Sequence, residues 1–120
     1  MEKIDILKNK LKTAKSNFSK SQTRCTGEFE KFRKSKDAPR KRQERCAGDA
    51  LESLNLMGEK LKIVMIAGEN LISEIDDQGT KADKPEELIK SINSEIDTDE
   101  EKLKEFMTRM MESSKRLRPP

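Results

Sequence analysis

The sequence predicts an all-α fold: an elongated antiparallel three-helix bundle with coiled-coil-like packing, formed as a single domain by residues 1–120. Apolar residues recur seven apart, the spacing that places side chains in one seam along a helix. Charged residues make up 41% of the chain and hydrophobic residues 32%. A helical bundle tolerates this ratio because each helix buries only one apolar stripe. Proline and glycine divide the chain into three long segments.

The first predicted helix runs from about residue 2 to residue 34. Ala38-Pro39 ends this segment, because the residue before a proline avoids the helical region. Gly27 lies inside the helix and costs about 1 kcal/mol relative to alanine. The apolar seam of the helix consists of Ile4, Leu7, Leu11, Ala14, Phe18, Cys25, Phe29 and Phe32.

The second predicted helix covers residues 40–76 and carries two adjacent apolar seams. A helix with two seams packs against two neighbours, so we expect it to be the central element. Gly79 is the expected C-cap. The first seam is Ala47, Ala50, Leu54, Met57, Leu61, Val64, Gly68, Leu71 and Ile75, and the second is Leu51, Gly58, Met65 and Ile72.

The third predicted helix covers residues 85–116 and is followed by a flexible tail, residues 117–120. Two interpretations compete near its middle. The pattern Thr98-x-x-Glu101 is typical of a capping box and would start a new helix at residue 99. The apolar frame continues without a break through Asp99, its one polar member, and favours a single helix that is bent near residues 97–99. The alternative to the monomeric bundle is an oligomeric coiled coil, in which a hairpin pairs with a second copy.

The composition argues against several classes of function. The chain has no histidine and two cysteines, so the commonest general base is missing and a structural zinc site cannot form from cysteine and histidine alone. We therefore expect no enzymatic activity, no cofactor, no metal and no small-molecule substrate. There is no apolar run of the roughly 18 residues that a membrane span needs. Charges throughout the first ten residues argue against a signal peptide, so an intracellular protein, cytoplasmic or nuclear, is expected.

The two cysteines flank the turn between the first two helices. Cys25 and Cys46 are equidistant from position 35.5, so an antiparallel hairpin would place them at one level and a disulfide would be geometrically possible. Without a secretory signal, reduced thiols in the core are favoured.

Charge is segregated along the chain. Residues 1–45 carry a net charge of +9, residues 46–101 of −10 and residues 102–120 of +4. An up-down-up bundle brings the basic ends to one tip of the rod. The candidate anion-binding or nucleic-acid-binding residues there are Arg33, Lys34, Lys36, Arg40, Lys41, Arg42, Arg45, Lys115, Arg116 and Arg118.

Part of this basic tip lies at a helix N-terminus, where positive charge is unfavourable. Arg40, Lys41 and Arg42 fall at the expected N-terminus of the second helix, which repels positive charge. Either the helix is frayed until about Glu44, or the cluster binds an anionic partner. That partner would be a nucleic acid contacted through its phosphates, or an anionic membrane surface. All four phenylalanines fall on apolar seams, so base stacking is not expected.

The favoured function is a non-enzymatic helical module for protein–protein interaction or self-assembly. Its basis is the pair of seams on the second helix and the thin core. Met111, one position off the seam of the third helix, is the candidate partner contact. The alternative is a nucleic-acid-associated module that uses the basic tip.

One segment resembles a known family. Residues 7–20, and within them Lys15-Ser16-Asn17-Phe18-Ser19, resemble the start of the Gag polyproteins of BEL/Pao-type retroelements. Those proteins begin with a basic helix carrying a Lys-x-x-Phe/Leu-Thr/Ser motif and continue as helical hairpins. The resemblance implies a structural, self-associating role with RNA or a partner protein nearby. This sequence has no zinc knuckles, so the resemblance does not extend to RNA packaging.

Overall fold

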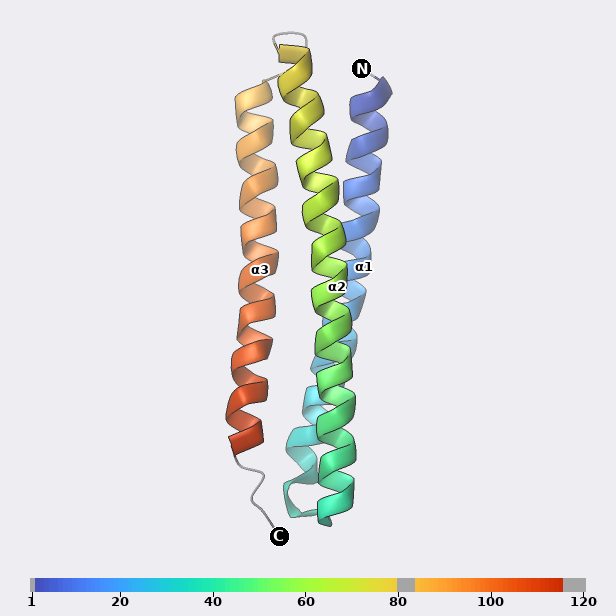
Figure 1. The fold of residues 1–120 in the computed structure, drawn as a ribbon, viewed down its shortest axis with the longest axis vertical. Helices are drawn as coiled ribbons and strands as arrows, with labels where there is room; N and C mark the ends of the chain where they lie inside the picture. Colours follow the sequence, from blue (N-terminus) through green and yellow to red (C-terminus); the bar gives the residue numbers. More distant parts are fainter. Residues whose placement is uncertain (1, 80–83, 116–120) are drawn as a thin grey trace.

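The computed structural model describes residues 2–79 and 84–115, which form a rod of three long helices measuring 63 × 19 × 16 Å (Figure 1). The predicted elongated antiparallel three-helix bundle is confirmed. Its elements in chain order are α1 (Glu2–Lys34), the 3₁₀ turn η1 (Ser35–Asp37), α2 (Arg40–Gln78) and α3 (Pro85–Lys115).

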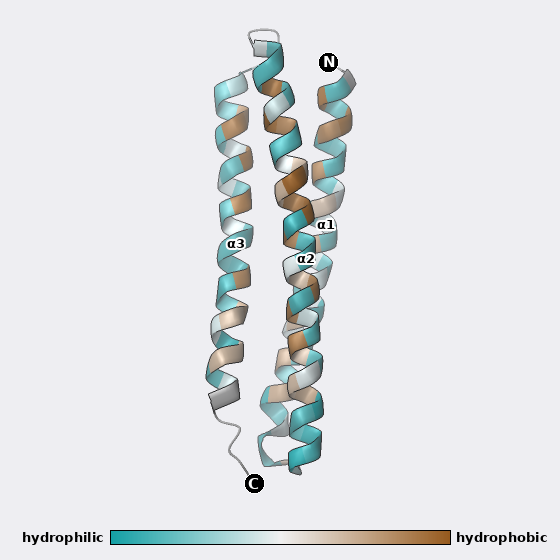
Figure 2. Ribbon diagram, in the orientation of Figure 1, coloured by the Kyte–Doolittle hydropathy of each residue, from teal (hydrophilic) through white to brown (hydrophobic). Residues whose placement is uncertain are grey.

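Helix α2 is the central element, as its two seams predict. It lies between α1 and α3 and packs along both, whereas α1 and α3 run parallel and contact each other at few places (Figure 1). Apolar and polar segments alternate along each helix (Figure 2). The predicted first seam of α2 is buried from end to end apart from half-buried Ala47, at its start. The second seam is less covered, since Met65 and Ile72 are half-buried and Leu51 is 46% exposed.

Helix α3 is continuous, so a new helix starting at residue 99 is wrong. The capping box would need the Thr98 hydroxyl to accept a hydrogen bond from a backbone N–H group that follows it. Instead this hydroxyl donates to the carbonyl of Ser94 at 3.0 Å, one turn earlier in the same helix. The apolar frame therefore decides the outcome: Ile92, Ile96 and Phe106 are all buried on the face of α3 that points toward the other two helices.

The turn between α1 and α2 is short and well ordered. Helix α2 begins at Arg40, directly after Pro39, so fraying until Glu44 does not occur. Pro39 accepts backbone hydrogen bonds from Arg42 and Gln43 through its carbonyl. The side-chain amide of Gln43 donates to the carbonyls of Lys36 (2.8 Å) and Ala38 (3.0 Å), which ties η1 to the first turn of α2.

This turn sets the register of the hairpin. Because η1 prolongs the path of α1, the chain reverses near residue 39 and not at position 35.5. Residues at one level of α1 and α2 have numbers that add to about 78, as in the ion pair of Lys3 with Glu74 (3.3 Å). Cys25 consequently lies beside Ser53.

The expectation that the two cysteines share a level is wrong. At this register Cys46 is level with about residue 32, seven residues from Cys25, which is roughly 10 Å along the helix axis. Both cysteines are free thiols.

Helices α2 and α3 approach each other closely at Gly68. A Cβ atom added at this position would lie 2.5 Å from Cδ1 of Ile96 and 3.5 Å from Cγ2 of Ile92. The absence of a side chain therefore lets the two isoleucines pack against the α2 backbone. About three turns further along, α2 ends at Gly79, the predicted C-cap, which has a φ of 54°.

We predict that Gly68→Leu destabilises the protein by about 1–3 kcal/mol, because a side chain there must displace both isoleucines of α3. Gly58→Leu is the matched control, since a Cβ at Gly58 meets nothing within 4 Å. The control should leave stability unchanged or raise it by up to about 1 kcal/mol, through better helix propensity. Urea unfolding followed by circular dichroism measures both. Equal effects of the two substitutions would contradict the close approach.

Candidate functional site

The candidate sites on the described residues are surface features. In the two described ranges, no group of three or more histidine, cysteine, aspartate or glutamate side chains is placed to hold a metal ion. A helix long and apolar enough to cross a membrane does not occur among residues 2–79 and 84–115. The candidate sites are therefore exposed apolar residues and clusters of charge.

An exposed apolar groove lies between α1 and α2. We call it the outer groove; its volume is about 590 Å³. Three isoleucines on it are strongly exposed: Ile6 (55%), Ile63 (50%) and Ile66 (57%). Its lining comes from Ile6, Leu7, Asn9, Lys10, Thr13, Ala14 and Asn17 of α1 and from Ile63, Ile66, Ala67 and Asn70 of α2.

The outer groove faces away from α3. On α1, Lys15 and Phe29 contact α3, and neither lines the groove. On α2, Gly68 meets α3, whereas Ile63 and Ile66 lie outside both predicted seams. A two-helix hairpin has two open sides. In the described part of the chain, α3 covers one of them, and nothing covers the other.

Sequence reasoning missed this groove. Ile6, Ile63 and Ile66 were not assigned to any seam, although the signal was present as large apolar residues outside the heptad frame. The sequence alone does not show that α1 and α2 place these three isoleucines on the same side of the hairpin. That follows only from the hairpin register.

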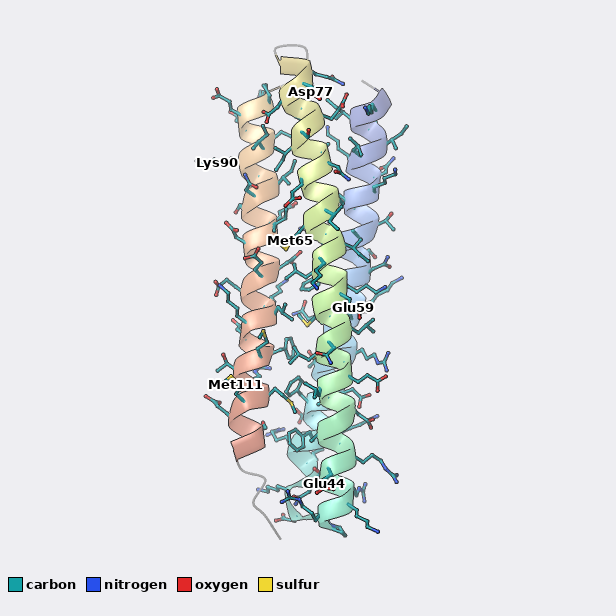
Figure 3. The ribbon with its side chains drawn as sticks, viewed as in Figure 1. Glu44, Glu59, Met65, Asp77, Lys90 and Met111 are labelled. Atoms are coloured by element: carbon teal, nitrogen blue, oxygen red, sulfur yellow. The ribbon has the colours of Figure 1, made fainter. Side chains whose placement is uncertain are left out.

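A second exposed apolar area includes the predicted partner contact. Met111 is 63% exposed, the highest value among the large apolar residues described, and Met107 is 49% exposed (Figure 3). Leu51 of α2 is level with about residue 113, because Gly68 lies against Ile96 in the antiparallel pair. Leu51 and Met111 therefore lie at similar height near the basic end of the rod, and Met107 lies one helical turn farther from that end.

The basic tip is assembled at the hairpin turn. Arg33 and Arg40 are partly neutralised by ion pairs with Glu30 and with Glu44, the second at 2.9 Å. The guanidinium of Arg33 also holds the pKa of Glu30 below its ordinary value. Lys36, Lys41, Arg42 and Arg45 are exposed and form no ion pair with another described residue.

Cations of both helices converge at this tip on a pocket of about 310 Å³. It is lined by Lys31, Lys34, Ser35, Ala38, Arg42 and Cys46, with no acidic residue among them. Helix α3 ends at Lys115 at the same end of the rod (Figure 1). Arg116 and Arg118 lie outside the described residues.

Asp99 is the one buried charged residue among those whose burial the structure describes. Its side chain lies on the inner face of α3 at 6% exposure, and its Oδ2 has no hydrogen-bond partner among the described residues. The ammonium of Lys15 on α1 is 3.9 Å from Oδ2, but it lies closer to Glu95, at 3.3 Å. Burial raises the pKa of Asp99, an effect that Lys15 and Lys102 oppose and Glu95 reinforces.

Cys25 is placed to be inert. Burial raises the pKa of its thiol, and the neighbouring Ser53 offsets this only in part. A thiol that stays protonated is a poor nucleophile and a poor metal ligand. Cys25 therefore serves as a small apolar residue of the core.

Comparisons with family models, with curated proteins and with solved structures found no match. The resemblance of residues 7–20 to BEL/Pao-type Gag proteins accordingly stays a prediction.

We predict that Asp99→Leu stabilises the protein by about 1–3 kcal/mol at pH 7, because it replaces a buried, poorly satisfied carboxylate with an apolar side chain in the same seam. The raised pKa means that the folded state keeps the Asp99 proton at pH values where the unfolded state has lost it. The Asp99 carboxylate therefore destabilises the fold fully at pH values above its pKa in the folded state. This destabilisation decreases as the pH falls toward the pKa of the unfolded state, near 3.9.

The gain from Asp99→Leu should accordingly shrink between pH 7 and about pH 4. Asp97→Leu, at an exposed neighbouring position, is the matched control and should change stability little at either pH. Urea unfolding at both pH values measures the effect. A loss of stability in Asp99→Leu at pH 7 would mean that the attraction to Lys15 outweighs the cost of burial.

Proposed function

We propose that this protein is a non-enzymatic helical interaction module that binds its partner through the outer groove. The observation that carries the proposal is the gathering of three half-exposed isoleucines along one groove between α1 and α2. Single exposed apolar residues are common, but a contiguous apolar surface is typical of an interaction site.

The shape and lining of the groove suit a helix. A straight groove between two long antiparallel helices accepts the apolar face of a further helix, with anchors spaced along it. Asn9, Thr13, Asn17 and Asn70 line the groove and offer neutral hydrogen-bonding groups at its margins. Ile63 and Ile66 lie one turn apart on α2 and would form the apolar centre of such an interface.

The test is site-specific photo-cross-linking in cells that produce the protein. A photoreactive residue at position 63 should give discrete adducts, with another protein or with a second copy. The same residue at Lys90, on α3 and absent from the groove lining, is the matched control and should give none (Figure 3). The absence of any adduct at position 63 would overturn the proposal.

A paired set of variants checks the apolar contact. With the photoreactive residue moved to Thr13, the double substitution Ile63→Glu and Ile66→Glu should abolish the adducts while circular dichroism shows an intact helical fold. The control, Ser91→Glu with Ser94→Glu at exposed positions of α3, should leave the cross-linked adducts unchanged.

A second candidate function is binding of nucleic acid through the basic tip. The observation that favours it is the start of α2: Arg40, Lys41 and Arg42 form its first turn with no acidic residue among them, although the helix dipole disfavours cations there. Contacts would be made to phosphates, since all four phenylalanines are buried and none can stack on a base.

We predict that the triple substitution of Lys36, Lys41 and Arg42 by glutamine weakens RNA binding by about tenfold or more. It should also lower the slope of log K against log salt by about 0.7 for each phosphate that the variant no longer neutralises. Fluorescence anisotropy with single-stranded RNA at several salt concentrations measures both. Substitution of Lys8 and Lys12 of α1 and Lys90 of α3, exposed lysines far from the tip, is the control. Equal affinity of the tip variant and the unaltered protein would remove this candidate.

A further inference from the structure

We infer that the occupant of the outer groove is a second copy of this chain, related by a two-fold axis that runs parallel to the rod, so that α1 of each copy packs on α2 of the other. The inference rests on the proposed function and names its partner. It is carried by the charges on the surface that continues the two sides of the groove toward the hairpin turn, and by the register of the hairpin.

The margin on α1 is basic. Thr13 and Asn17 line the groove, and Lys20 and Arg24 each lie seven residues further along, on the same faces of the helix. Both cations are exposed, and neither forms an ion pair with another described residue.

The continuation of the α2 margin toward the hairpin turn carries two carboxylates, with Lys62 and Arg45 on the same face beyond either end of the pair. Ile66 lines the groove, and Glu59 and Glu52 lie seven and fourteen residues before it on the same face. Both carboxylates are exposed, and neither is ion-paired within the described residues. Figure 3 labels Glu59 near the middle of α2. At the levels of these four residues, the surface that continues the groove thus has one basic margin and one acidic margin.

A two-fold axis parallel to the rod makes these margins complementary. Such an axis exchanges the two sides of the groove but leaves every residue at its own height. Within the chain, residues of α1 and α2 at one height have numbers that add to about 78. Lys20 therefore reaches the level of the partner's Glu59, and Arg24 the level of the partner's Glu52, each pair occurring twice in the dimer.

The apolar residues meet in the same arrangement. Ile63 and Ile66 lie at the height of Thr13, close to the middle of the groove lining on α1. The two hairpins then form a four-helix bundle in which every neighbouring pair of helices is antiparallel. The side face of the rod is 63 Å long, and a standard interface needs only about 800 Å² on each partner.

The other symmetric arrangement is disfavoured by charge. A two-fold axis perpendicular to the rod would stack α1 on α1 and bring the basic margins together, and α2 on α2 with the acidic margins together. Like charges placed opposite each other in an interface oppose association. Only the parallel axis sets each basic margin against an acidic one.

The test is complementation between two charge-reversed chains. Lys20→Glu makes positions 20 and 59 both acidic, and Glu59→Lys makes both basic. In the proposed dimer each variant alone opposes like charges, whereas a one-to-one mixture restores every pair as opposite charges. Light scattering behind size exclusion, at low and at high salt, should show a dimer for the unaltered protein. Each single variant should weaken the dimer by about tenfold or more, and the mixture should recover it.

The controls separate this inference from the proposed function. Lys90→Glu, on α3, should not change the dimer. A monomeric unaltered protein, or a mixture that does not recover the dimer, would overturn the inference. If position 63 then still cross-links to another protein, the groove is an interaction site with a different occupant. If position 63 cross-links to nothing, the proposed function fails as well.

Discussion

The structure depends on one constraint: α2 must pack against α1 and α3 at the same time along its length. Its buried seam is narrow, and nearly every position on it is occupied by an apolar or small residue. Gly68 shows how tight the arrangement is, since the α3 isoleucines fill the volume that a side chain would take. Helices α1 and α3 are held in place largely by α2, because they contact each other at few points, among them Phe29 with Phe106, whose ring centroids lie 5.5 Å apart.

Much of the fold followed from periodicity. The seam of α2, the continuity of α3 and the cap at Gly79 all come from local chemistry that a single sequence displays. The register of the hairpin could not be predicted from periodicity, because it depends on η1 and on hydrogen bonds from Gln43 that fix where the chain reverses. An error of a few residues in the turn moved the expected partner of Cys25 by two helical turns. The same register decides which exposed isoleucines lie together, and so the outer groove could not be predicted either.

The buried polar residues of the bundle differ in whether their polar atoms have hydrogen-bond partners. Ser21, Ser35 and Ser53 are buried, and each donates its hydroxyl to a carbonyl three residues earlier, so they cost little. Asp99 has no comparable partner for Oδ2 and is held near a lysine that is shared with Glu95. A buried polar residue in an apolar seam penalises shifted pairings of the helices, which is one way to choose a single register at a cost in stability.

Helix α2 packs more extensively against α1 than against α3, and this difference affects how the bundle opens. Helices α1 and α2 share the more extensive interface and are joined by a short, hydrogen-bonded turn, whereas α3 is attached chiefly through α2. The hairpin and α3 thus differ in local stability, and the opening of lowest free energy is the release of α3 from an intact hairpin. That release would uncover the inner face of α2 and leave the outer groove unaltered. The face that we assign to association therefore belongs to the more extensively packed part of the fold.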